Sequence, residues 1–256
     1  MHVFIHGVPD TPHMWTPLIE ALELEDHEYE TPALPGFVGP PPIGFGCTKE
    51  EYSDWLIKRV ERIVEQTGAP VHLVGHDWGA ILALRIASRR PELFKTWAVA
   101  NALIDTQYEG HRMAKLWATP VIGELVMVLG RNQTRLAQGL TAAGLPEDMA
   151  KHEATHWKRD MRSAILKLYR SARGLRINPA WEDDLADLPE RGLVLWGETD
   201  PYVTLDVAER FEKRWGYPLH IERGAGHWAI VKRAPSIAEQ LKKHWSGQTQ
   251  DEAPYS

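Results

Sequence analysis

The stretch Val71-His72-Leu73-Val74-Gly75-His76-Asp77-Trp78-Gly79-Ala80 decides the fold of this chain. Its first four residues are mostly apolar and β-branched, which predicts a buried strand, and the apolar periodicity after Gly79 predicts a helix packed on the sheet. Between them, Gly75-x-Asp77-x-Gly79 has the spacing of the nucleophile elbow G-x-S-x-G, with Asp in place of Ser. Glycines flank the central residue because so sharp a turn leaves no room for side chains. The stretch therefore predicts an α/β fold that presents Asp77 above the edge of its sheet.

Composition restricts the class of protein. The 256 residues are 43% hydrophobic and 25% charged, which fits a globular fold with a large core. A net charge of −6 argues against nucleic acid as a partner, because that role normally needs a basic face. A single cysteine, Cys47, excludes an internal disulfide and fits a reducing compartment. With no basic leader and no apolar run of membrane-spanning length, we expect a cytoplasmic protein without a membrane span.

The rest of the chain alternates predicted strands and helices. Thr48-Lys49-Glu50-Glu51 is a capping box that should begin a helix ending near Gln66. Other helices are predicted at 14–23, 205–215 and 235–245, and the polar segment 248–256 is expected to fray. Predicted strands cover 2–5, 28–31, 71–74, 96–100, 192–196 and 219–221. These strands predict a mainly parallel sheet of about six strands.

Residues 105–180 follow a different pattern. Helical stretches there are interrupted by Thr119-Pro120, Gly130, Gly144 and Gly174, and no strand is long enough to extend the sheet. This predicts a helical insertion at 105–180 between two parts of one α/β core, 1–104 and 181–256.

Three further loops carry polar or turn-forming residues directly after predicted strands. His6-Gly7-Val8-Pro9 follows the first strand, Gly197-Glu198-Thr199-Asp200 follows the strand at 192–196, and Gly224-Ala225-Gly226-His227-Trp228 follows the strand at 219–221. Open parallel sheets place their sites at the carboxyl ends of strands, so these loops should converge on Asp77. Asp77, Asp200 and His227 follow one another in this order along the chain.

These motifs resemble those of the α/β-hydrolase superfamily, and within it the epoxide hydrolases and haloalkane dehalogenases that use an Asp nucleophile. The resemblance implies that Asp77 is the nucleophile, His227 the base and Asp200 its orienting acid, although Glu198 lies close enough in sequence to replace Asp200. It also implies an oxyanion hole formed by the backbone N–H groups of Val8 and Trp78. Segment 105–180 would be the cap, and the sheet would lack two strands that usually precede the first one here.

The resemblance also implies the chemistry. An aspartate that attacks an sp3 carbon forms an ester, which a water molecule activated by His227 then hydrolyses. No cofactor is needed, and the substrate would be a small hydrophobic epoxide or halide. Residues next to the catalytic ones, together with cap tryptophans, are expected around the substrate: His6, Pro9, His76, Trp117, Trp157 and Trp228.

What leaves in the first step separates the two activities. Epoxide hydrolases protonate the opening oxygen with cap tyrosines, and Leu166-Lys167-Leu168-Tyr169-Arg170 resembles the segment that carries one of them. Tyr169 is therefore the predicted acid, and Tyr108 the candidate for the second. A dehalogenase needs two N–H donors for the halide instead. Trp78 would supply one, and Trp117 or Trp157 the other, because Val8 stands where dehalogenases often have Asn.

Two other classes of protein stay open. His152-Glu153-Ala154-Thr155-His156 is a literal H-E-x-x-H, which on a helix could bind zinc, but no third ligand is apparent and the hydrolase motifs would then be unexplained. The fold could also serve as a non-catalytic receptor for a ligand. The sequence does not decide between a monomer and a homodimer.

Overall fold

The computed structural model describes residues 1–247, so the predicted fraying of 248–256 lies outside the described residues. Within them the chain forms one six-stranded sheet in the order β2-β1-β3-β4-β5-β6, and every neighbouring pair is parallel. This confirms the predicted α/β fold with its parallel sheet. The strands are β1 His2–Ile5, β2 Tyr29–Glu30, β3 Val71–His76, β4 Phe94–Ala100, β5 Gly192–Gly197 and β6 Leu219–Glu222.

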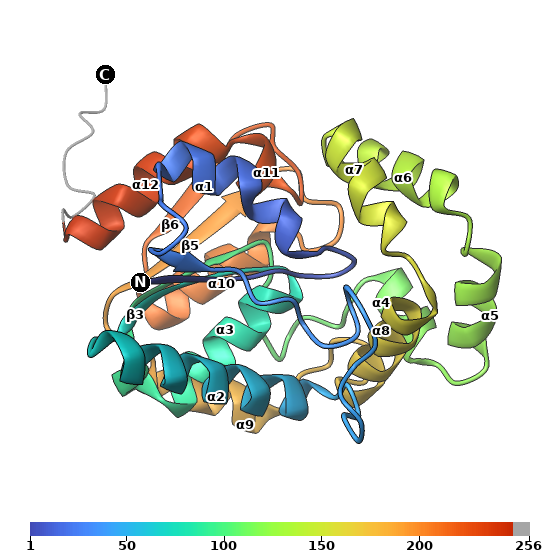
Figure 1. Ribbon diagram of the computed structural model, residues 1–256, viewed down its shortest axis with the longest axis horizontal. Coiled ribbons are helices and arrows are strands. Elements are labelled where there is room, and N and C mark those ends of the chain that lie inside the picture. Colours follow the sequence, from blue (N-terminus) through green and yellow to red (C-terminus); the bar gives the residue numbers. More distant parts are fainter. Residues whose placement is uncertain (248–256) are drawn as a thin grey trace.

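Helices cover both faces of the sheet (Figure 1). On one face lie α1 (Thr16–Leu22), α11 (Ala229–Lys232) and α12 (Ala234–Ser246), and on the other lie α2 (Lys49–Thr67), α3 (Trp78–Arg89), α9 (Pro179–Asp183) and α10 (Leu205–Trp215). Three short 3-10 helices complete the core: η1 Pro12–Trp15, η2 Pro91–Leu93 and η3 Asp184–Asp187. The predicted capping box forms at α2, where the Thr48 hydroxyl accepts from Glu51 N at 3.2 Å. None of the helices in residues 1–247 is both long and apolar enough to cross a membrane.

Of the six α-helices between β4 and β5 in the described chain, the first five lie together beside the sheet (Figure 1). They are α4 Arg112–Ala118, α5 Ile122–Leu129, α6 Gln133–Ala142, α7 Glu147–Thr155 and α8 Arg159–Ser171. All five fall inside the predicted insertion, and we propose that residues 105–180 form the cap, a name kept for this segment below.

The elbow at Asp77 combines a strained backbone with close contacts to the first strand. Asp77 has φ 51° and ψ −124°, a conformation that non-glycine residues rarely adopt. A Cβ at Gly79 would lie 2.0 Å from the carbonyl oxygen of Ile5, and a Cβ at Gly7 would lie 2.4 Å from Cβ of Asp77. The glycines are therefore required because backbone segments from β1 and β3 meet around the Asp77 side chain.

We expect Gly79→Ala to lower the free energy of unfolding by about 3 kcal/mol, because the new methyl group overlaps backbone that cannot move away. Urea unfolding measures the change. Gly39→Ala is the control, since no atom lies within 4 Å of its added Cβ, and it should stay within about 0.5 kcal/mol of the wild type. Equal stability of the two variants would refute the close approach at the elbow.

Candidate active site

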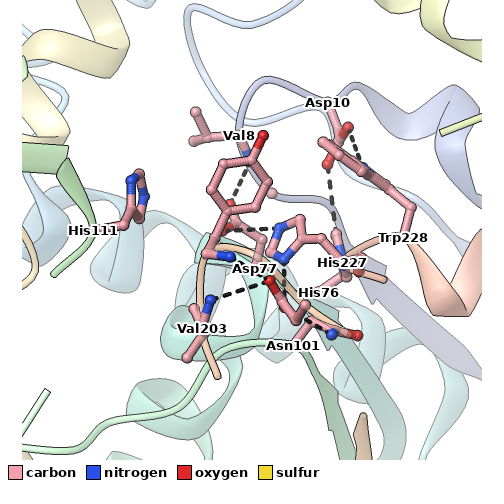
Figure 2. A network of polar contacts seen from close by, with 12 residues as sticks. Val8, Asp10, His76, Asp77, Asn101, His111, Val203, His227 and Trp228 are labelled. Atoms are coloured by element: carbon pink, nitrogen blue, oxygen red, sulfur yellow. Dashed lines mark hydrogen bonds and ion pairs between the residues drawn. The ribbon is translucent and has the colours of Figure 1, made fainter. Parts of the chain in front are cut away.

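Three loops bring Asp77, Asp200 and His227 together at the carboxyl edge of the sheet. Asp77 lies between β3 and α3, Asp200 follows β5, and His227 follows β6. His227 Nδ1 is 2.8 Å from Asp200 Oδ2, and its Nε2 is 3.6 Å from Asp77 Oδ2 (Figure 2). The structure thus brings together the three residues for which the sequence predicts the roles of nucleophile, base and orienting acid. Glu198 instead accepts a hydrogen bond from Gly224 N at 2.8 Å, so it orients the loop rather than the histidine.

Backbone and amide donors hold Asp200 in place. Its Oδ1 accepts from Tyr202 N at 2.8 Å and from Val203 N at 3.1 Å, and its Oδ2 accepts from Asn101 Nδ2 at 2.9 Å. Sequence reasoning missed Asn101, although it follows directly on β4 and so lies at the same edge of the sheet as the other loops.

The charges of the triad stabilise one another. Burial alone would lower the pKa of His227, but Asp200 and then Asp77 outweigh it and raise this pKa to about 10. Burial opposes ionisation of both carboxyl groups, yet His227 is close enough to lower the pKa of Asp77 and of Asp200. The resting site therefore holds an imidazolium between two carboxylates.

The other oxygen of Asp77 is held by the turn after β1. Val8 N donates to Asp77 Oδ1 at 2.7 Å, and the N–H of Trp78 also helps to lower the pKa of Asp77. Both amides were predicted as the oxyanion hole. Val8 N contacts this oxygen directly, and the N–H of Trp78 acts on the same carboxyl group, so both donors lie where they can stabilise negative charge on Asp77.

A cavity of about 340 Å³ lies above Asp77, between the core and the cap. Its wall is largely apolar, as expected for a small-molecule site. The predicted residues Asp77, Val8, Pro9, Trp117, Trp157, Tyr169, His227 and Trp228 line it, and His111, Tyr202 and Arg135 join them without having been predicted.

Tyr169 and His111 provide the cap's polar groups nearest the reactive centre. The Tyr169 ring lies edge-on to Trp78, 5.4 Å between centroids, and burial followed by the charge of Asp77 raises the pKa of its phenol well above the usual value. His111 is the N-cap of α4, and its Nδ1 accepts from Ala114 N at 3.2 Å. Burial lowers the pKa of His111 and so favours the neutral ring, and an Nδ1 that accepts a hydrogen bond leaves the ring proton for Nε2. Tyr169 and His111 therefore supply a phenol and an imidazole to the wall of the cavity that Asp77 also lines. Figure 2 draws His111 beside the polar network without a contact to it.

Three predicted site residues do not reach the cavity. The Tyr108 hydroxyl donates to the carbonyl oxygen of Tyr202 at 2.8 Å, and Tyr108 is not among the residues that line the cavity. His6 is fully buried, and Leu34 N donates to its Nε2 at 3.0 Å, so it supports the turn after β1. His76 is fully buried as well, with Nε2 2.9 Å from the carbonyl oxygen of His227. Its position behind the triad suits it to hold the His227 loop.

A buried polar network connects the cap with this loop. Asp10 Oδ2 is 3.6 Å from His76 Nδ1, and Asp10 Oδ1 accepts from Trp228 Nε1 at 3.0 Å (Figure 2). From the cap side, Glu153 on α7 accepts from the Thr11 hydroxyl at 3.1 Å. Burial and then the neighbouring Asp10 raise the pKa of Glu153 to about 9. Glu153 is therefore a neutral acid near pH 7, buried where the cap meets the core.

The H-E-x-x-H motif does not form a metal site in the part of the chain that the structure describes. Glu153 points to Thr11, while the His152 ring stacks on His13 at 3.7 Å between centroids. No group of three or more His, Cys, Asp or Glu side chains among residues 1–247 is arranged to hold a metal ion.

Comparison with known proteins identifies the family. The Alpha/beta hydrolase family matches residues 3–239, and the chain belongs to it. A haloalkane dehalogenase from Bradyrhizobium diazoefficiens is 30% identical over 93% of this chain and 84% of its own length. An epoxide hydrolase from Caballeronia sordidicola is 22% identical over 93% and 85% of the two chains.

A third relative matches over a shorter length, and solved structures share the fold. The (E)-2-((N-methylformamido)methylene)succinate hydrolase of Acinetobacter baylyi matches over 40% of this chain and 37% of its own length. The crystal structure of an epoxide hydrolase from Vigna radiata superposes with a TM-score of 0.73 at 18% identity, covering 96% of this chain and 90% of that one. The chain is thus an α/β hydrolase, with both a haloalkane dehalogenase and an epoxide hydrolase among its relatives.

Glu153→Gln tests the buried acid. Between about pH 4.5 and 9 the unfolded chain releases the Glu153 proton while the folded chain keeps it, so wild-type stability falls as pH rises through this window. Gln has the shape of the neutral acid and does not titrate. We expect the variant to melt at least about 3 °C higher than the wild type at pH 8, with the difference vanishing near pH 4.

Glu147→Gln is the matched control, because Glu147 lies on the same helix, is exposed and pairs only with Lys151. Thermal melts from pH 4 to 9 should show no pH-dependent difference for it. A Glu153→Gln effect of the same size at pH 4 and pH 8 would mean that Glu153 does not keep its proton in the folded chain.

Proposed function

We propose that this α/β hydrolase opens epoxides to vicinal diols through an ester on Asp77. The observation that carries the proposal is the pair of cap donors, the Tyr169 phenol and the His111 Nε2–H, on the cavity that contains the Asp77 carboxylate. An epoxide oxygen gains negative charge and needs a proton as the ring opens, whereas a departing halide needs none. A phenol that keeps its proton at rest suits the first task.

In the first step, Asp77 Oδ2 attacks an epoxide carbon and the C–O bond of the ring breaks. The oxygen takes the proton of Tyr169, while the His111 N–H stabilises it by a hydrogen bond. The resulting alkoxide is far more basic than a phenolate, so the raised pKa of Tyr169 does not prevent the transfer. In this proposal His111 takes the second position, for which sequence reasoning had chosen Tyr108.

Ester formation removes one negative charge from the site and so makes it easier for His227 to lose its proton. Asp77 loses its negative charge, so one of the two carboxylates that raised the pKa of His227 is gone. His227 then gives up its proton, which restores Tyr169, and the neutral imidazole can act as a base. The site thus switches His227 from imidazolium to base only after the intermediate exists.

In the second step, His227 takes a proton from water as the water oxygen attacks the ester carbonyl of Asp77. The N–H groups of Val8 and Trp78 hold the oxyanion on Oδ1. Collapse breaks the bond between the Asp77 carbonyl carbon and Oδ2, and the leaving oxygen takes the proton from His227. The proton of the new carboxylic acid returns to His227, which regenerates the resting state.

Haloalkane dehalogenation is the second candidate, and the indole N–H of Trp78 favours it. This N–H is buried and makes no hydrogen bond of normal geometry among the described residues, although the Tyr169 hydroxyl lies close to it. A halide could accept from it in that position. Of the two proposed second donors, Trp157 Nε1 already donates to Gly130 O at 2.9 Å, which leaves Trp117. This route would give the same Asp77 ester but would not need Tyr169.

Turnover of 1,2-epoxyhexane and 1-bromohexane separates the candidates. We expect diol from the epoxide and a Tyr169→Phe variant with kcat/KM lowered about 100-fold, the usual loss when a general acid is removed. Gas chromatography measures diol, and an ion-selective electrode measures bromide.

Tyr108→Phe is the control, since the hydroxyl of Tyr108 contacts the Tyr202 backbone and does not line the cavity; kcat/KM should stay within about threefold of the wild type. Bromide release without diol, unaffected by Tyr169→Phe, would replace the epoxide proposal with the dehalogenase.

A further inference from the structure

Arg135 is the only lysine or arginine that lines the cavity in the described chain. The other ionisable side chains on the wall, among them Asp77, His227 and Tyr169, belong to the reactive centre. Arg135 also has no carboxylate within ion-pair distance in residues 1–247, whereas Arg170 of the cap pairs with Glu124. Its guanidinium is therefore available to a ligand.

Helix α6 places Arg135 at the outer end of the cavity. Arg135, Leu136, Gly139 and Leu140 share one face of α6, and all four line the cavity. The Leu140 side chain is buried, at 5% exposed, whereas the Arg135 side chain is exposed to solvent. At 1.5 Å per residue, the two positions are about 7.5 Å apart along the helix axis. The cavity therefore runs along α6 from a buried, apolar region to a cation at the solvent.

The charge of the cap has the same sign as Arg135. Residues 105–180 contain twelve Lys and Arg against seven Asp and Glu, although the whole chain has 29 against 35. The cap is thus basic on a chain that is acidic overall. The net positive charge of this segment favours the approach of anions over the approach of cations.

We infer that Arg135 selects substrates with an anionic head group, such as a carboxylate, joined by an apolar chain to the epoxide. The guanidinium binds the head group at the mouth, the apolar wall holds the chain, and the reactive carbon lies at Asp77. Arginine suits this task because its planar fork matches a carboxylate with two hydrogen bonds. The inference rests on the proposed function and specifies its substrate class.

The test compares terminal epoxides of straight-chain acids of six to eleven carbons with their uncharged methyl amides. The wild type should show a higher kcat/KM for the acid at the best-fitting length. In Arg135→Gln the ratio of kcat/KM for acid to that for amide should fall roughly 10-fold, mainly through KM, because the ion pair lies at an exposed rim. Arg131→Gln is the matched control, since Arg131 is exposed, precedes the same helix and does not line the cavity; its ratio should stay as in the wild type.

A binding measurement separates failure of this inference from failure of the proposed function. Calorimetry with decanoate and decanamide on the Asp77→Asn chain needs no turnover, and Arg135→Gln added to it should weaken decanoate binding roughly 10-fold more than decanamide binding. If no epoxide is consumed but this difference appears, the proposed function fails and the anion site stands. An acid-to-amide ratio near one in the wild type, or equal losses in Arg135→Gln and Arg131→Gln, would overturn the role of Arg135.

Discussion

The turn at Asp77 is the constraint on which the rest of this structure depends. Its positive φ is tolerated only because Gly75, Gly79 and Gly7 let backbone from β1, β3 and α3 meet without a side chain between them. That close approach places Val8 N against one oxygen of Asp77 and leaves the other toward His227. The stability of the folded sheet thus offsets the backbone strain at Asp77 and holds its carboxylate in a fixed position.

The charges of neighbouring side chains determine which buried groups of this site carry a proton. Two carboxylates raise the pKa of His227 and hold its proton, and in the proposed mechanism the loss of one of these charges on esterification would release it. A second buried pair, Asp10 and Glu153, lies where the cap meets the core, and there burial and the neighbouring Asp10 favour the neutral form of Glu153. The same physical rule, that burial disfavours an uncompensated charge, therefore gives an ion triad at the reactive centre and a neutral acid under the cap.

Sequence reasoning reached the sheet and the loops around Asp77, Asp200 and His227 because each loop follows its strand directly. Strand ends locate side chains in an α/β sheet to within a few residues, so local pattern suffices there. In the cap, which has no strands, no comparable rule predicts from the sequence which side chains face the cavity. Whether Tyr108 or His111 faces the cavity depends on how α4 packs, and Glu153 turns inward from a motif typical of zinc sites only because α7 lies against Thr11. No sequence motif around Arg135 indicated that it lines the cavity, because its position depends on which face of α6 points toward the cavity.

The covalent ester on Asp77 is the central claim, and intact-protein mass spectrometry of His227→Gln tests it most directly. Without the base, the ester should form and persist. After incubation with an epoxide that the wild type hydrolyses, the account predicts a mass increase equal to the whole epoxide, mapped by peptide sequencing to Asp77. An unmodified chain under conditions in which the wild type consumes that epoxide would contradict the account.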